Sequence, residues 1–185
     1  MSARAKNWAP RAGRLLTLSL AVLLFAATPG LAAKDDLAKD DELPESELSQ
    51  GQGGRGHWAS VLQEGTHNEA KIDQSGAGHR ASVIQSGSDN LALVSQSGQA
   101  HVLALIQSGS LNSADIEQRG NGNAADVFQT GMANEVALRQ AGSGNYARID
   151  QVGNFNSAEV RQSEHDSTVT VRQYGDYLKA RVTRN

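Results

Sequence analysis

A glutamine recurs every eleven residues over most of this 185-residue chain, without an insertion or a deletion. The residue two positions before it is always Val, Ile or Leu, and the residue two positions after it is Gly in every unit except at Glu164. So strict a period predicts a repeat architecture, in which every unit is a copy of one small structural element. The glutamines are Gln63, Gln74, Gln85, Gln96, Gln107, Gln118, Gln129, Gln140, Gln151, Gln162 and Gln173.

The shared residues within each unit are spaced by two. Relative to the glutamine, Asn or His usually stands six positions before, Ala four before, an aliphatic residue two before and Gly two after. Alternate side chains lie on one face of a strand, so we expect a strand of about five residues followed by a turn that contains the Gly. An eleven-residue period also suits a right-handed helical supercoil. However, Gly costs a helix about 1 kcal/mol per unit, and Val and Ile favour strands.

No single unit can bury its apolar face, so the units must stack. If two units form one turn, the turns repeat every 22 residues and identical residues lie about 4.8 Å apart along the stack. The predicted fold is an all-β, two-sheet, amyloid-like β-solenoid of about six such turns. Amides of successive turns can then form a ladder of hydrogen bonds, as in cross-β structures. This stacking ladder comprises the eleven glutamines and Asn68, Asn90, Asn112, Asn123, Asn134, Asn145 and Asn156.

The repeated pattern Ala-x-(Val/Ile/Leu)-x-Gln-x-Gly-x-x-Asn, iterated as Ala70-Lys71-Ile72-Asp73-Gln74 through Asn156, resembles the curlin repeat of bacterial functional amyloid. The resemblance covers about residues 57–185. It implies a structural subunit of extracellular curli fibres, which serve adhesion and biofilm formation, and not an enzyme. Ser, His and Asp all fall at repeat positions or turns, so the sequence offers no catalytic, cofactor-binding or metal-binding set. The chain also has no Cys, which excludes disulfides and thiolate metal sites.

Curlins comprise a major fibre subunit and a minor, nucleating subunit, and this chain most resembles the minor one. An acidic lead that includes residues 45–49 precedes the first unit, and the last unit, residues 178–185, is degenerate and basic. The resemblance implies nucleation of the major subunit, or of the chain itself, by strand addition. It also implies an anchoring end at the outer-membrane surface, with Lys179, Arg181 and Arg184. A major fibre subunit and a non-amyloid secreted β-solenoid that binds a ligand or surface are the alternatives.

Residues 1–33 have the features of a secretory signal peptide. Four basic residues precede an apolar run over residues 15–27 and a small-x-small cleavage site at 30–32. That run is too short to span a bilayer. We therefore expect export through the periplasm and, from the resemblance, through the curli secretion channel with its accessory proteins. Residues 34–56 are acidic and Gly-rich and are expected to be a disordered lead to the repeat domain, residues 57–185.

The charge balance argues against a nucleic-acid partner. Loss of the signal peptide removes four basic residues and no acids, so the mature chain is more negative than the formal −3 of the whole sequence. Binding to nucleic acid depends on neutralising phosphates with Lys and Arg. No small-molecule substrate is indicated either.

Two further sets of residues recur every 22 positions. His57, His79 and His101 replace Asn and should form a column, whose protonation below about pH 6 should weaken assembly; the alternative is three tolerated turn residues. An outward apolar stripe one position before the glutamine is expected to contact a partner or a neighbouring fibre, although scattered apolar surface residues are ordinary. The stripe consists of Leu62, Ile84, Ile106 and Phe128. The opposite sheet should expose charged residues.

Overall fold

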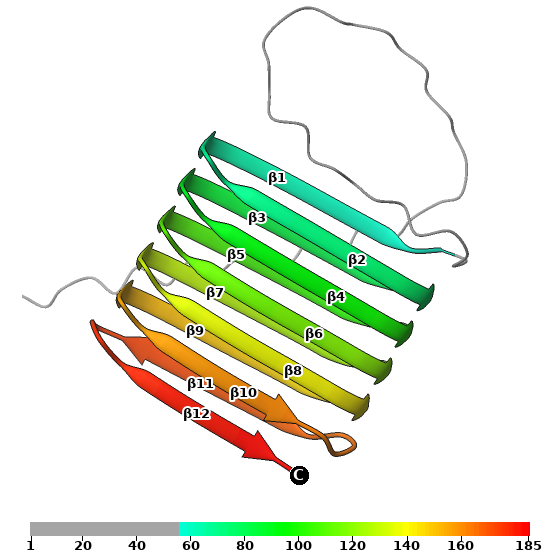
Figure 1. Cartoon of the computed structure of the whole chain (residues 1–185). Helices are drawn as coiled ribbons and strands as arrows, with labels where there is room; N and C mark the ends of the chain where they lie inside the picture. Colours follow the sequence, from blue (N-terminus) through cyan, green and yellow to red (C-terminus); the bar gives the residue numbers. More distant parts are fainter. Residues whose placement is uncertain (1–55) are drawn as a thin grey trace, which may run out of the picture. The chain divides into compact units, whose positions relative to one another are not determined.

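The computed structural model describes residues 56–185, which form twelve β-strands (Figure 1). They are β1 (Trp58–Thr66), β2 (Glu69–Ala77), β3 (Arg80–Ser88), β4 (Leu91–Gln99), β5 (Val102–Ser110), β6 (Ser113–Asn121), β7 (Ala124–Met132), β8 (Glu135–Ser143), β9 (Tyr146–Asn154), β10 (Ser157–Gln162), β11 (Thr168–Tyr174) and β12 (Lys179–Arg184). The expected signal peptide and nearly all of the expected lead lie outside the described residues. Within residues 56–185, no helix has the length and apolar character needed to cross a membrane.

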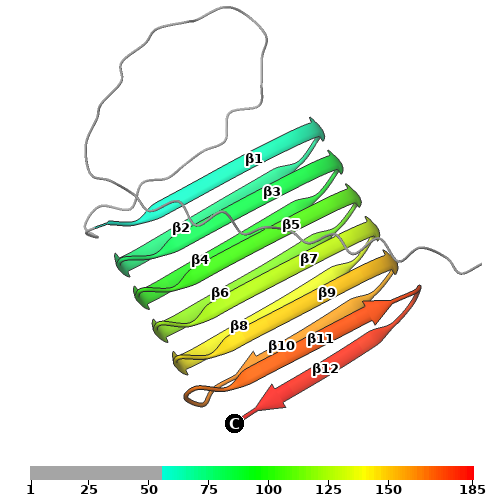
Figure 2. The ribbon, with the colours of Figure 1, turned by 180° about the vertical axis from the view of Figure 1, so that it is seen from behind.

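Successive strands alternate between two parallel sheets. The odd-numbered strands form sheet A and the even-numbered strands form sheet B, each six-stranded and in chain order (Figures 1 and 2). Each strand pairs in register with the strand 22 residues later, so that Val83 lies between Val61 and Leu105. One turn of the solenoid, here called a rung, therefore contains two units. The predicted two-sheet β-solenoid of about six rungs is confirmed.

The side chains between the sheets form one apolar cluster. In its centre, Leu105, Ile116 and Leu138 have no exposed surface. Full burial of such a side chain contributes about 1.5–3 kcal/mol. Val61 and Val182, in the first and last rungs, are only partly buried. The end rungs are therefore held less firmly than the central ones, because each has a neighbour on one side only.

The strands are longer than the sequence predicted. Strands β1 to β9 contain nine residues each instead of about five, because pairing continues through the Gly. The expected position of the turn was also wrong: the tight bend lies two residues beyond the Gly, where φ is 54–71°. The residues at the bend are His67, Gly78, Asp89, Ala100, Leu111, Gly122, Ala133, Gly144, Phe155, Asp166 and Tyr177.

Close approach of the backbones explains the Gly that follows each glutamine. Its φ lies between 98° and 127°, a region that residues with a side chain rarely adopt. A Cβ on Gly109 would overlap the carbonyl oxygen of Gly131 in the next rung. Glu164 is the exception, and it occupies a different setting. Strand β12 ends opposite Gln162, so no described residue lies over Glu164 in the next rung.

We expect Gly109→Ala to destabilise the solenoid by at least about 3 kcal/mol, because both the backbone angle and the overlap with Gly131 must be relieved. Gly122→Ala is the matched control. Its Cβ would enter open space, and Ala100 and Ala133 already adopt the same left-handed conformation. Denaturant unfolding of the freshly refolded monomer measures both effects. Equal losses of stability in the two variants would refute the close-approach explanation.

Candidate functional site: polar columns and end rungs

The glutamines of each sheet form a hydrogen-bonded column inside the solenoid. Gln85 Nε2 donates to Gln107 Oε1 at 2.8 Å, and Gln107 Nε2 donates to Gln129 Oε1 at 2.8 Å. Each bond runs from one rung to the following one, so the column has a direction. The column of sheet A contains Gln63, Gln85, Gln107, Gln129, Gln151 and Gln173, and that of sheet B contains Gln74, Gln96, Gln118, Gln140 and Gln162.

The glutamine amides also join the two sheets. Gln107 Nε2 in sheet A donates to the carbonyl of Leu91 in sheet B at 3.0 Å, and Gln118 in sheet B bonds Val102 in sheet A at 3.3 Å. Among the described residues, no buried side-chain nitrogen or oxygen lacks a partner. Full satisfaction matters, because a buried amide without a partner costs about 1–3 kcal/mol.

The asparagines form columns that run in the opposite direction. The backbone N–H and Nδ2 of Asn112 donate to Oδ1 of Asn90 in the preceding rung, at 3.1 and 3.0 Å. Asn112 Nδ2 also reaches the carbonyl of Gly131 at 3.1 Å. One column contains Asn68, Asn90, Asn112, Asn134 and Asn156, and the other contains Asn123 and Asn145. The asparagines thus close the ends of the strands by linking three rungs.

The three histidines continue the column of Asn123 and Asn145. Their rings are stacked, with centroids 4.9 Å apart, and His79 and His101 are fully buried. The backbone N–H of Asn123 donates to His101 Nδ1 at 3.1 Å, while His101 Nε2 lies 2.9 Å from the carbonyl of Ser97. A carbonyl only accepts, so Nε2 carries the proton and the ring is neutral. Each imidazole thus replaces an asparagine Oδ1 as the acceptor for the next rung.

Protonation would break this arrangement, because Nδ1 would become a donor that faces an N–H. Burial lowers the pKa of His101 below its ordinary value of 6.5; the bond to the Ser97 carbonyl raises it in part, and His79 lowers it. Because the pKa of His101 is lower in the folded chain than in the unfolded chain, the neutral imidazole stabilises the folded state fully above about pH 6.5. It is lost as the pH falls through the lowered folded value.

We therefore expect the variant with His57, His79 and His101 all changed to Asn to lose the fall in stability between pH 7.5 and pH 5. Neutral asparagines keep the acceptor and cannot be protonated in this range. His67→Asn is the control, because His67 is exposed at the bend. Denaturation midpoints across the pH range measure the effect. A triple variant with the parent's pH dependence would eliminate a titrating role for the column.

The expected stripe on sheet A lies in register over four strands, since Leu62, Ile84, Ile106 and Phe128 are consecutive partners. Leu62 and Ile84 are exposed, whereas Ile106 and Phe128 are half-buried. The polar cluster that ends the stripe was not predicted from the sequence. Asp150 follows Phe128 in the column, and Arg148 bonds both of its carboxylate oxygens, at 3.2 and 3.1 Å. The Arg148 guanidinium lies 5.2 Å from the centre of the Phe128 ring.

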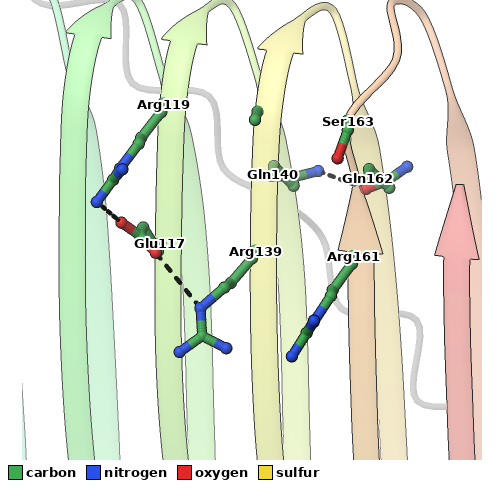
Figure 3. A pocket seen from close by; sticks show the side chains of 8 residues that line it. Glu117, Arg119, Arg139, Gln140, Arg161, Gln162 and Ser163 are labelled. Carbon is green, nitrogen blue, oxygen red and sulfur yellow. Dashed lines mark hydrogen bonds and ion pairs between the residues drawn. The ribbon is translucent and has the colours of Figure 1, made fainter. Parts of the chain in front are cut away.

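Sheet B exposes a network of ion pairs instead. Glu117 pairs with Arg119 and with Arg139, whose Nε lies 3.4 Å away (Figure 3). These residues and Arg161 surround a shallow hollow of about 500 Å³ beside the small Ala141. Exposed pairs contribute at most about 1 kcal/mol each. The arginines around the hollow, Arg119, Arg139 and Arg161, already pair with carboxylates of the same sheet.

The columns end differently in the last rung. Ser167 and Leu178 occupy asparagine positions, and their N–H groups are bound by Asn145 and Asn156 at 3.1 and 2.9 Å. Leu178 offers no amide oxygen to a further rung. Arg184 pairs opposite Gln162, in the position of a ladder glutamine.

The residues expected at the anchoring end all lie on β12 and are exposed. Arg181 is held by Glu159, 2.7 Å from its carboxylate. Lys179 pairs in register with Ser157 at the beginning of the strand. No group of three or more His, Cys, Asp or Glu suited to a metal occurs within residues 56–185.

Stacked rungs, buried amide columns and open sheet edges at both ends define a structural, self-complementary parallel β-solenoid. The family model described as Curlin associated repeat matches residues 51–76, 65–98, 103–131, 109–142 and 131–163, which together cover more than half of the chain. The chain therefore belongs to the curlin repeat family. This family comprises structural subunits of extracellular curli fibres and not enzymes, and the fold and repeats fit such a subunit. No curated protein matches the chain.

Proposed function

We propose that this protein is the minor curlin subunit, which nucleates curli fibres and anchors them at the cell surface for adhesion and biofilm formation. The observation that supports this proposal is the difference between the two ends of the stack. A fibre subunit needs two complementary ends, so that the last rung of one copy accepts the first rung of the next. A nucleator needs one end that templates growth and another that is free for attachment.

The first rung has the features of a template. Strands β1 and β2 are the edges of their sheets, and a parallel edge can be extended by a strand from another chain. Among residues 56–185, no donor reaches Oε1 of Gln63 or Gln74, whereas every later ladder glutamine accepts from the preceding rung. A subunit whose last rung carries the consensus glutamines would supply these donors. The partner is then the major subunit. This chain's own last rung supplies only Gln173, because Arg184 stands in the other glutamine position.

The last rung is a poor template. A rung added there would place an asparagine N–H against Leu178, which has no acceptor, and an unsatisfied N–H costs about 1–3 kcal/mol. Lys179, Arg181 and Arg184 give this end a positive charge, even though Glu159 binds Arg181. Basic clusters are attracted to anionic membrane surfaces by about 1 kcal/mol per residue. We therefore assign the last rung to attachment at the outer membrane.

The route to that surface follows from the expected signal peptide and the family. The chain is exported to the periplasm, passes the curli secretion channel with its accessory proteins, and folds outside the cell. The rungs are held together by hydrogen bonds and apolar packing, and the chain has no Cys, so folding outside the cell requires no disulfide formation.

Deletion of residues 176–185 should leave seeding of the major subunit in vitro largely intact but release the protein from the cell surface. Seeding is measured from the lag of thioflavin fluorescence, and attachment by fractionation of cells and medium. The matched variant with Lys179, Arg181 and Arg184 changed to Ser keeps the rung but removes its charge. Retention of the truncated protein on cells would exclude attachment through the last rung.

Restoring the ladder should convert the last rung into a template. We expect the variant with Ser167→Asn, Leu178→Asn and Arg184→Gln to form fibres by itself faster than the parent, because an added rung would then find its amide partners. Arg172→Gln, on the outward face of the same rung, is the control. An unchanged rate of self-assembly would show that the lost ladder residues do not limit growth at this end.

A further inference from the structure

The outward face of sheet A is ridged in a way that sheet B is not. The apolar ridge consists of the residues one position before the glutamines, which are Leu62, Ile84, Ile106 and Phe128. Beside it runs a small-residue groove, Ser60, Ser82 and Ala104, three positions before the glutamines. Leu62 is 51% exposed and Ile84 is 37% exposed. The ridge is therefore an apolar surface that is exposed at Leu62 and Ile84, half-buried at Ile106, and flanked at Phe128 by the Arg148 guanidinium.

The ridge and the groove complement each other under one symmetry operation. A twofold axis parallel to the stack, midway between them, reverses the strand direction but keeps each rung level with itself. It therefore places Ile84 of one copy against Ser82 of the other, and Ile106 against Ala104. An axis parallel to the strands would instead place ridge on ridge. Interdigitation of large and small side chains is the packing of dry interfaces between stacked sheets.

The charges of sheet A fit the same operation. It places Arg148 of one copy against Asp150 of the other, in the rung where the apolar ridge has ended. Asp126 would meet Phe128, but the Tyr146 hydroxyl already donates to that carboxylate at 2.7 Å. This bond, followed by burial, raises the pKa of Tyr146. Sheet B fits the operation less well, because Glu117 would face Asp115 of the other copy and like charges repel, although Asp73 would face Lys71 and Arg161 would face Glu159.

We propose that two copies of this chain pack through sheet A about this twofold axis, side by side and with their stacks parallel. The proposal rests on the fibre function, since parallel stacks can then grow together. The height of the face is set by six strands about 4.8 Å apart, and its width by the seven residues of each strand from five positions before the glutamine to one after it, at about 3.3 Å each. The face therefore measures about 660 Å², or about 1,300 Å² for both copies. This lies within the range of stable specific interfaces, about 1,200–2,000 Å².

Cross-linking tests the predicted neighbours directly. Protein with Ser82→Cys is mixed with protein with Ile84→Cys and treated with a bis-maleimide that spans about 10 Å, the separation of packed sheets. The mixture should give a product that joins residues 82 and 84, at a yield at least about tenfold above that of the matched pair on sheet B. Leu93→Cys mixed with Ser95→Cys is that matched pair, on β4. Equal yields from the two pairs would overturn the proposal.

A second pair of variants tests the contact without cysteines. Ile84→Lys with Ile106→Lys should reduce lateral pairing of fibres, seen as fibre width by electron microscopy, at least about tenfold, because the lysines would be buried in the groove. Leu93→Lys with Ala137→Lys adds the same charge to sheet B and should leave the width unchanged. Width that is the same for both variants and the parent would contradict the proposal.

Seeding by the same preparations separates the two proposals. We expect the sheet A lysine variant to seed growth as the parent does, since its end rungs are unchanged. If the parent fails to seed while the 82–84 product still forms, the proposed function fails and the lateral contact stands. If the parent seeds and the 82–84 product does not form, the lateral contact alone is overturned.

Discussion

The hydrogen bond between side-chain amides of successive rungs is the interaction on which the structure depends. Gln107 Oε1 accepts a hydrogen bond from Gln85 in the rung before, and Gln107 Nε2 donates to Gln129 in the rung after and to the Leu91 carbonyl of the other sheet. A slip of one residue would turn this amide outward and bring outward-facing residues, such as Ser108, between the sheets. Each buried amide left without a partner costs about 1–3 kcal/mol. The summed cost over several rungs would therefore exceed the total stability of many small domains. The amides thus impose the register that apolar packing alone leaves open.

The direction of these bonds makes the stack polar. Each glutamine amide donates to the glutamine of the following rung, whereas each asparagine Oδ1 accepts from the backbone N–H of the following rung. The first and last rungs therefore expose different donors and acceptors even where their residues are identical. The histidines fit the same scheme, because Nδ1 accepts from the following rung as asparagine Oδ1 does. A substitution in a column is tolerated if it preserves the acceptor, and Leu178 is the point where that condition fails.

The sequence predicted the fold well because its period of two assigns every side chain to the core or to solvent. It did not predict the bend, which falls on Ala100, Leu111 or Tyr177 as readily as on Gly. There the backbone bonds to adjacent rungs override local preference: the N–H of Leu111, for example, donates to the Ser88 carbonyl at 3.0 Å. Of the candidate site, the columns could be read from the spacing. The tautomer of His101 and the bond between Arg148 and Asp150 could not be predicted, since both depend on contacts that only the folded chain forms.

The inward and outward positions are under different physical constraints, and this difference allows the two faces to diverge. Inside, the side chain, the Gly and the backbone of each rung must match those of the next, because Gly109 and Gly131 leave no room for a Cβ. Outside, a residue needs only compatible neighbours above and below. Sheet B meets this need with internal ion pairs such as those of Glu117 with Arg119 and Arg139. Sheet A meets it with aliphatic neighbours, which can reduce their exposure further only by contact with another surface. A strict repeat inside is therefore compatible with a solvated face on one side and an adhesive face on the other.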